Sequence, residues 1–332
     1  MESKQYFWLL ATPFIYAITA LVLTNAAHSQ SIWHPERNVE IVISTGPGGG
    51  SDRVGRVIQK IWHDNVMIKS STVVNRPGGG GTIAWTYLNQ YPGDGHYLSI
   101  APLFLLTNHI TGRSKLNYTD FTPVALLTSE NVAFMVKLDS PIKDGRDFVD
   151  RLRKDPASLS LAIGGTTGGS NHIALGLLMK AAGGDVKKLK IVIFNSTGES
   201  VSALIGGHVD VLTAAGNMAA RQAHQGKVRV IAVAAPKRLG SDLASVPTWK
   251  EQGLDVVADQ WRSVIGPKSM TPQQLTFWNG VFGKMVETEA WKQDLDKSLV
   301  ESNYMNSTQA LEFMKTEYET LRTVLSELGL VK

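Results

Sequence analysis

The stretch VEIVISTGPGGGSDRVGR, residues 39–56, decides the fold. It begins with β-branched residues at positions 39, 41 and 43, an alternation typical of a strand. A glycine-rich loop from Gly46 to Ser51 follows, and after Asp52 the apolar residues at 54, 57, 58 and 61 have helical spacing. A helix that starts directly after such a loop presents free backbone N–H groups and the positive end of its dipole. The stretch therefore predicts an anion-binding loop between a strand and a helix.

The same strand–loop–helix pattern recurs twice. A strand at 72–74 leads through the four glycines Gly78 to Gly81 into a helix at 82–90, and a strand at 159–163 leads through a small-residue loop at 164–170 into a helix at 172–182. Further strands are expected at 97–101, 132–136, 191–194, 209–213 and 228–234, with helices at 144–153 and 198–206. Alternating strands and helices predict mostly parallel sheets covered by helices. Three such loops at strand ends, in two domains, favour a ligand site over simple tight turns.

The C-terminal part returns to the first domain. Residues 260–265 read as an extended crossing segment, and Thr271-Pro272 with Gln274 has the pattern of a capping box that starts a helix. The last helix carries one apolar stripe and ends at Gly329. The stripe consists of Leu311, Met314, Tyr318, Leu321, Leu325 and Leu328. We expect a first domain of residues 30–128 and 258–332 and a second of residues 129–257, joined by two crossing strands.

Composition narrows the class of protein. The 332 residues are 43% hydrophobic and 19% charged, as in an ordinary globular protein large enough for two cores. A net charge of +4 would help an acidic small molecule to approach but is too small to indicate nucleic-acid binding. Cysteine is absent, which excludes disulfides, thiolate metal sites and cysteine nucleophiles.

The N-terminus predicts export. Lys4 precedes an apolar run at 6–23, and small residues follow at Ala26, Ala27 and Ser29. This is the pattern of a signal peptide, residues 1–29, cleaved after Ala27 or Ser29, and the alternative is an uncleaved membrane anchor. We expect a periplasmic protein.

Known catalytic and cofactor motifs do not occur. The loop at 46–51 lacks the Lys-Ser/Thr pair of a P-loop, and Gly79-x-Gly81-x-x-Ala84 matches only a relaxed dinucleotide fingerprint without the acid that would bind a ribose. No G-x-S-x-G elbow or H-E-x-x-H motif is present, and the eight histidines are scattered. We therefore expect no cofactor, no metal and no catalytic residues.

Three side chains are individual candidates. Asp52 is able either to contact a cationic group of the ligand or to cap its own helix, and we favour the cap. His172 lies in the first turn of its predicted helix and suits either ligand contact or a capping or packing role. Arg262, in the crossing segment, is able either to clamp a carboxylate or to pair with an acid across the hinge.

Taken together, nine segments resemble one family, the solute-binding proteins of tripartite tricarboxylate transporters (the TctC or Bug family). They are PGGGSDRVGR (47–56), VVNRPGGGGTIA (73–84), DGHYLSI (94–100), FTPVALL (121–127), GGSNHIALGLLMKAAGG (168–184), LIGGHVDVL (204–212), GKVRVIAVAAPKRL (226–239), VPTWKEQGLDV (246–256) and WRSVIGPKSMTPQQ (261–274). They are collinear over nearly the whole chain after residue 29, and the last two resemble the citrate-type branch.

The resemblance implies a type II periplasmic-binding-protein fold, with two α/β lobes, a hinge of two strands and a ligand in the cleft. It implies a non-catalytic, monomeric binder of a citrate-like di- or tricarboxylate that delivers its ligand to membrane permease subunits. The carboxylate would be held largely by backbone amides, with Thr45-Gly46 forming part of the pocket wall. With Arg262 added, the predicted ligand-binding residues are Thr45, Gly46, Gly48, Gly49, Gly50, Ser51, Asp52, Gly79, Gly80, Gly81, Thr82, Thr166, Thr167, Gly168, Ser170, Asn171, His172, Asn195, Thr197, Ala215, Asn217 and Arg262.

Two other functions are compatible with the sequence. A ligand sensor that docks on a two-component kinase would use the same fold. An exported hydrolase of acidic esters would need a nucleophile with a base, and the sequence shows no such pair.

Overall fold

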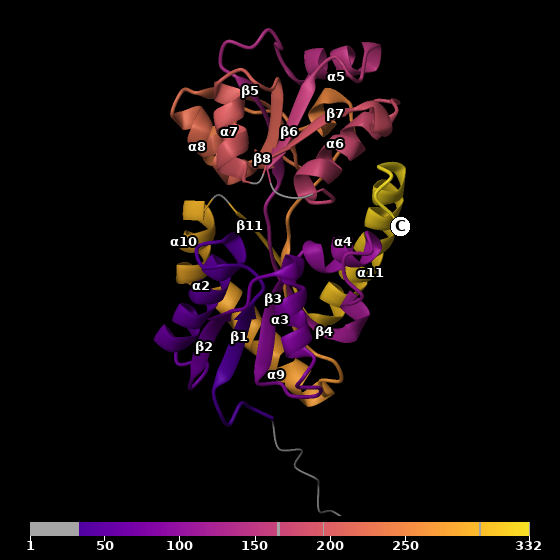
Figure 1. The fold of residues 1–332 in the computed structure, drawn as a ribbon. Coiled ribbons are helices and arrows are strands. Elements are labelled where there is room, and N and C mark those ends of the chain that lie inside the picture. The colour runs from indigo at the N-terminus through magenta and orange to yellow at the C-terminus, as the bar shows by residue number, and fades with distance from the viewer. Residues whose placement is uncertain (1–32, 165–166, 195, 299, 332) are drawn as a thin grey trace, which may run out of the picture. The chain divides into compact units, whose positions relative to one another are not determined.

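The computed structural model describes residues 33–164, 167–194, 196–298 and 300–331. The predicted signal peptide and two predicted site residues, Thr166 and Asn195, lie outside the described residues. Within the described part, strands form two separate sheets, of six and five strands. Each sheet with its helices is called a lobe here, lobe 1 for the six-stranded sheet and lobe 2 for the five-stranded one (Figure 1).

Lobe 1 is built around the stretch that opened the sequence analysis. Its sheet has the order β11-β4-β10-β3-β1-β2. The strands are β1 (Val39–Ile43), β2 (Ser71–Asn75), β3 (Tyr97–Pro102), β4 (Phe121–Ser129), β10 (Arg262–Pro267) and β11 (Glu301–Met305). Its helices are α2 (Gly50–Asp64), α3 (Thr82–Leu88), α4 (Phe104–Ile110), α9 (Pro272–Val286), α10 (Glu289–Ser298) and α11 (Ser307–Glu327). The predicted strand–loop–helix units at 39–61 and 72–90 are confirmed, the second with a 3₁₀ turn, η1 (Gly79–Gly81), before α3.

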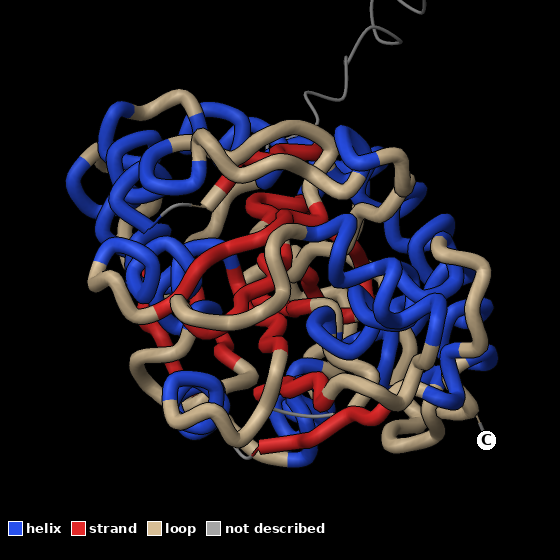
Figure 2. Tube along the Cα trace, turned by 90° about the horizontal axis from the view of Figure 1, so that it is seen from above, coloured by secondary structure: helices blue, strands red, loops and turns tan. Residues whose placement is uncertain are grey.

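Lobe 2 comes from the middle of the chain. Its sheet has the order β7-β6-β8-β5-β9. The strands are β5 (Val132–Lys137), β6 (Ser160–Gly164), β7 (Lys190–Phe194), β8 (Val211–Ala215) and β9 (Val228–Ala234). Its helices are α5 (Gly145–Lys154), α6 (Ser170–Ala181), α7 (Thr197–Ile205) and α8 (Gly216–His224). Seen from above, strands lie inside and helices outside, as expected for helix-covered sheets (Figure 2).

The expectation of mostly parallel sheets is wrong. Parallel pairing joins β1 to β2 and β3, and β6 to β7 and β8, but β10 and β11 in lobe 1 and β5 and β9 in lobe 2 pair antiparallel. The reason is the path of the chain, because it leaves lobe 1 through β4 and re-enters it through β10, so that each lobe contains strands running both ways.

The two crossing segments lie side by side. The segment after β4 leads into β5, and the segment before β10 returns from lobe 2. Asn131 and Asp259 form an antiparallel bridge, and the amide of Gln260 donates to the carbonyl of Glu130 at 2.9 Å. Such a paired, two-strand connection can bend without breaking either lobe's core, which places a hinge at residues 130–131 and 258–260.

Helix α11 contacts both lobes. Met314 and Leu321 are buried in the core of lobe 1. Near the other end, Glu327 pairs with Lys180 of α6 at 2.8 Å, and Leu328 lies so close to Gly176 of α6 that an added Cβ would be 3.0 Å from it. The last helix therefore fastens lobe 1 to α6 of lobe 2.

The predicted apolar stripe of this helix needs one correction. Leu311 is 47% exposed, although the helical spacing placed it on the buried face. It falls at the margin of the stripe, where a side chain on a helix is only partly turned toward the core. The predicted end at Gly329 agrees with the structure, since α11 stops at Glu327 and Gly329 has a φ of 70°.

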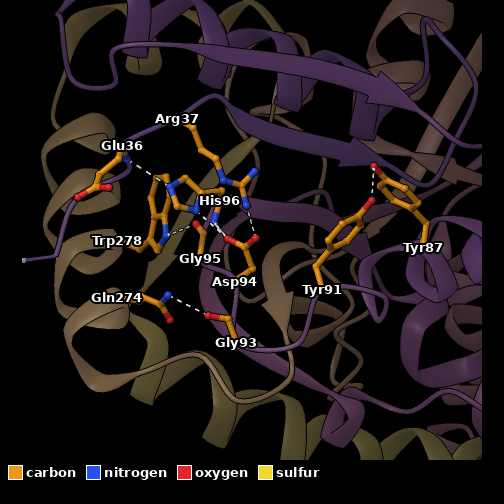
Figure 3. Close-up of polar contacts among 10 residues, drawn as sticks. All are labelled: Glu36, Arg37, Tyr87, Tyr91, Gly93, Asp94, Gly95, His96, Gln274 and Trp278. Atoms are coloured by element: carbon orange, nitrogen blue, oxygen red, sulfur yellow. Dashed lines mark hydrogen bonds and ion pairs between the residues drawn. The ribbon is translucent and has the colours of Figure 1, made fainter.

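The end of lobe 1 far from the hinge is closed by polar contacts to the turn at 93–95 (Figure 3). Gln274 donates to the carbonyl of Gly93 at 2.9 Å, and the indole of Trp278 donates to that of Gly95 at 3.1 Å. Both side chains come from α9, whose predicted capping box between Thr271 and Gln274 is confirmed. These bonds attach the returning chain to lobe 1.

None of the helices in the described ranges is both long and apolar enough to cross a bilayer.

Candidate functional site

The first glycine loop delivers an uncapped helix start to the space between the lobes. Helix α2 begins at Gly50, and its N-cap residue Gly49 has no side chain that could bond the free amides. Asp52 is therefore not the N-cap that the sequence suggested, but lies in the first turn. Its carboxylate accepts from the amide of Gly48 at 2.9 Å, from Arg56 at 2.9 Å and from Asn75 at 2.8 Å.

These bonds explain what Asp52 does in the loop. The hydrogen bond from Arg56, with those from Gly48 and Asn75, lowers the pKa of Asp52 to about 2 although the side chain is buried. The carboxylate is thus ionised at any physiological pH and folds the loop back onto its own helix. Asp52 therefore fixes the conformation of the loop and does not itself line the cavity.

Arg262 is the buried cation of the site, which Arg221 also lines. It is the first residue of β10, its side chain is only 6% exposed, and its Nη2 donates to Glu130 Oε2 at 3.2 Å. The ion pair across the hinge that the sequence suggested is therefore present. Yet Nε and Nη1 are both buried and have no hydrogen-bond partner among the described residues. Buried guanidinium nitrogens are rarely left without a partner, and an anion placed beside this side chain would supply one.

The guanidinium lies directly against the start of α2. A Cβ added to Gly50 would be 2.1 Å from Arg262 Nη2 and 2.7 Å from Cζ, so any larger residue at this position must displace the guanidinium. The arrangement brings a fixed positive charge and the positive end of a helix dipole to one point.

Lobe 2 presents three more helix starts to the same space. Helix α6 is preceded by Gly169 and α8 by Ala215, and neither start has a side-chain cap. Helix α7 is capped by Ser196, whose hydroxyl accepts from the amide of Glu199 at 3.2 Å. In the first turn of α6, the Oδ1 atom of Asn171 is buried without a partner among the described residues.

These groups line one cavity of about 510 Å³ between the lobes. Eight of the predicted site residues are among its lining residues, namely Gly48, Gly50, Ser170, Asn171, Thr197, Ala215, Asn217 and Arg262. Of the other seven, Gly164 and Gly169 belong to the predicted small-residue loop at 164–170, and sequence reasoning did not single out Phe104, Glu130, Met218, Arg221 and Gln260. The sequence did contain one sign that Glu130 and Gln260 belong to the site. Each is a polar residue within a segment expected to cross between the domains.

The second glycine loop opens onto a different cavity, of about 440 Å³. Gly79 and Gly80 line it with Phe104, Asn108 and Arg113, and Phe104 is common to both cavities. The remaining predicted residues that the structure describes line neither cavity. They are Thr45, Gly46, Gly49, Ser51, Asp52, Gly81, Thr82, Thr167, Gly168 and His172.

His172 supports the loop before α6. Its Nδ1 accepts from the amide of Gly168 at 3.1 Å, and burial, followed by the nearby Arg113 guanidinium, lowers its pKa to about 4. The ring is therefore neutral at physiological pH and holds the loop closed on itself. Arg113, from lobe 1, also donates to the carbonyl of Thr167 in lobe 2 at 2.9 Å.

Two acidic side chains, Asp259 of the hinge and Glu317 of α11, lie near each other. Burial, and then the nearby Asp259 carboxyl, raise the pKa of Glu317 to about 7. Burial raises the pKa of Asp259 as well, and a hydrogen bond with Ser129 partly offsets that effect. The described residues contain no group of three or more histidine or acidic side chains that could hold a metal ion.

Comparison with known proteins identifies the family. The family model described as "Tripartite tricarboxylate transporter family receptor", TctC, matches residues 55–330. The chain belongs to this family. Its members are periplasmic solute-binding proteins, not enzymes, which removes the hydrolase alternative.

Individual TctC-family relatives are distant but collinear. A protein of Cupriavidus necator, "UPF0065 protein in gbd 5'region", is 26% identical over all of this chain and 99% of its own length. A TctC solute-binding protein from Polaromonas, solved without ligand, has a TM-score of 0.78 at 22% identity, over 89% of this chain and 100% of its own. MatC from Rhodopseudomonas palustris, solved with bound malate, has a TM-score of 0.70 at 25% identity, over 88% and 100%. A second R. palustris protein, solved with adipate, has a TM-score of 0.74 at 21% identity, over 90% and 99%. The two-lobe fold predicted from the sequence is thereby confirmed.

Proposed function

We propose that this TctC-family protein binds a small di- or tricarboxylate of the citrate type in the 510 Å³ cavity and delivers it to the permease subunits of a tripartite transporter. The observation that carries the proposal is the buried guanidinium of Arg262, whose Nε and Nη1 lack partners among the described residues. A carboxylate is the anion that best matches such planar donors. MatC with malate and the R. palustris protein with adipate support an acid of this size.

The proposed contacts come from both lobes. From lobe 1, Arg262 and the first amides of α2 donate to one end of the acid. From lobe 2, the uncapped starts of α6 and α8 donate to the other end. The proposed contact residues are the eight predicted residues that line the cavity, and the other predicted site residues stay predictions.

This division gives a mechanism for closure. In an open form, the ligand bonds to one lobe only, and bending at the hinge adds the second set of donors in a drier space. Each charge-assisted bond contributes about 1.5–3 kcal/mol. Shifting a population from mostly open to mostly closed needs roughly 5 kcal/mol of differential affinity, so two or three added bonds suffice. We propose that the permease recognises the closed form.

We also propose how the chain is exported, where its lobes divide and in which oligomeric state it acts. Export through a signal peptide cleaved after Ala27 or Ser29, lobe boundaries near residues 129 and 257, and a monomer that meets its permease as a single chain are all proposals here. They follow from the sequence pattern and from the family.

The test is a binding panel on the purified protein. Citrate, malate, succinate and adipate are compared by thermal unfolding and calorimetry with neutral sugars and simple amines. An acid present at a hundred times its dissociation constant should add about 2.7 kcal/mol to the free energy of unfolding. If none of the acids stabilises the protein while a sugar or an amine does, the carboxylate proposal is wrong.

A pair of arginine variants adds the site to this test. Arg262→Gln removes the buried guanidinium and should weaken binding of the best acid by about tenfold or more, because at least one charge-assisted bond is lost. Arg238→Gln is the control, since Arg238 is an exposed residue that pairs with Glu251. Equal affinities in the two variants would remove Arg262 from the proposal.

A further inference from the structure

The cavity contains hydrogen-bond acceptors as well as donors. Glu130 lines it, with a side chain that is only 6% exposed and that receives one hydrogen bond among the described residues, from Arg262 Nη2. Asn171 lines it too, and its Oδ1 is buried without a donor among the described residues. A site for a bare carboxylate would need donors only. These two acceptors therefore favour a ligand that carries a hydrogen-bond donor as well as negative charge.

Electrostatics decide what faces Glu130. An ionised carboxylate has about four lone-pair sites, of which Arg262 uses one. A ligand carboxylate placed against it would meet a like charge in a buried space, which is strongly unfavourable. The part of the ligand next to Glu130 must therefore donate a hydrogen bond.

A hydroxyl fits this position better than an ammonium group. An ammonium next to Glu130 would also lie near the Arg262 guanidinium and the positive ends of the helices. A hydroxyl carries no charge, and it can donate to Glu130 or Asn171 while its own oxygen accepts from Arg262.

We propose, resting on the function proposed above, that the site selects hydroxy acids, in which a hydroxyl lies close to a carboxylate, over the corresponding acids without a hydroxyl. Glu130 and Asn171 read the hydroxyl, and Arg262 with the helix starts binds the carboxylates. A malate-bound and an adipate-bound R. palustris protein both share this fold, so the fold leaves the hydroxyl preference open. The side chains at 130 and 171 would set it in this chain.

The test uses acids that differ by the hydroxyl alone. Dissociation constants of malate against succinate, and of citrate against tricarballylate, are measured by calorimetry on the purified wild-type protein. We expect the hydroxyl to improve affinity by at least about tenfold, because a site built around a ligand hydroxyl discriminates against the analogue without it. Aspartate is included as the amine counterpart of malate.

Two variants connect the preference to the proposed residues. In Glu130→Gln, the amide oxygen stays with Arg262 and the amino group faces the ligand, so the malate-to-succinate ratio should fall to within about threefold. Asn171→Ala should lower the ratio as well, and it leaves the ion pair intact if loss of Glu130 prevents folding. Glu312→Gln is the control, on the exposed side of α11 where Glu312 lies near Lys315.

The outcomes separate this inference from the proposed function. If the acids bind but the hydroxyl makes no difference, the hydroxy-acid assignment fails and the carboxylate function stands. It also fails if aspartate binds more tightly than malate, or if both site variants keep the wild-type ratio. If no acid binds at all, the proposed function and this inference fail together.

Discussion

Substituting Gly50 by alanine tests the geometry at the centre of the site. Gly50 is the first residue of α2 and has no positive φ, so helix propensity alone predicts that alanine stabilises the protein, by up to about 0.5–1 kcal/mol. The structure predicts a different result, because the new Cβ would be 2.1 Å from Arg262 Nη2. The guanidinium is buried and attached to Glu130, so it cannot move aside freely.

The magnitude follows from the bonds at stake. Displacing the guanidinium by the necessary ångström removes at least one of its two proposed bonds to the ligand, at about 1.5–3 kcal/mol. The dissociation constant of the best-bound acid should therefore rise about 10- to 150-fold. Thermal unfolding without ligand should show no stabilisation, since the clash offsets the gain in helix propensity.

Gly280→Ala is the matched control. Gly280 lies in helix α9, and nothing within 4 Å would meet its added Cβ. This variant should show the ordinary stabilisation and leave binding unchanged. Calorimetry on the three proteins decides the matter. If Gly50→Ala binds within about threefold of wild type and is stabilised as Gly280→Ala is, the packing of Arg262 on α2 has no role in binding.

Two further predictions concern pH. Because the pKa of Glu317 is raised to about 7, the folded state binds more protons than the unfolded chain between about pH 4.5 and 7, and stability falls as pH rises through that window. Glu317→Gln should remove this loss, so at pH 8 its free energy of unfolding should exceed that of wild type by about 1–3 kcal/mol. Glu312→Gln should not change it. The pKa of His172 is lowered to about 4, so its contribution has the opposite sign, and stability falls as pH drops from about 6.5 to 4. His172→Gln should flatten the acid side of the curve, and a variant whose pH dependence matches wild type would contradict the corresponding assignment.

These two slopes oppose each other in wild type between about pH 4.5 and 6.5. A flat wild-type profile is therefore compatible with both shifts, and only the single variants reveal them. Denaturant unfolding at several pH values, with equal slopes in denaturant for all proteins, is the measurement that separates the two contributions.

The local elements were predictable because short-range rules determine them. Glycine loops after β-branched runs located β1 and α2, and the capping box at Thr271 located the start of α9. The direction of the strands was not predictable in this way. Hydrophobic periodicity is the same for a parallel and an antiparallel neighbour, so the reversal at β10 is invisible until the path of the chain is known.

The site was predictable where backbone donors form it and unpredictable where distant side chains meet. The loops at 46–51 and 164–170 are recognisable from their high content of glycine and other small residues. Glu130 does not, because its role depends on Arg262, 132 residues further along the chain. Asp52 shows a related limit. An aspartate near a helix start suggests a cap, but Arg56, one turn along the same helix, and Asn75 of β2 engage its carboxylate instead.

The attachment of α11 to both lobes has a practical consequence for handling this protein. Glu327 and Leu328 contact α6 within a few residues of Val331, so a purification tag fused after α11 would lie next to the contact between lobe 1 and lobe 2. An affinity measured on such a fusion would combine ligand binding with the effect of the added peptide on that contact.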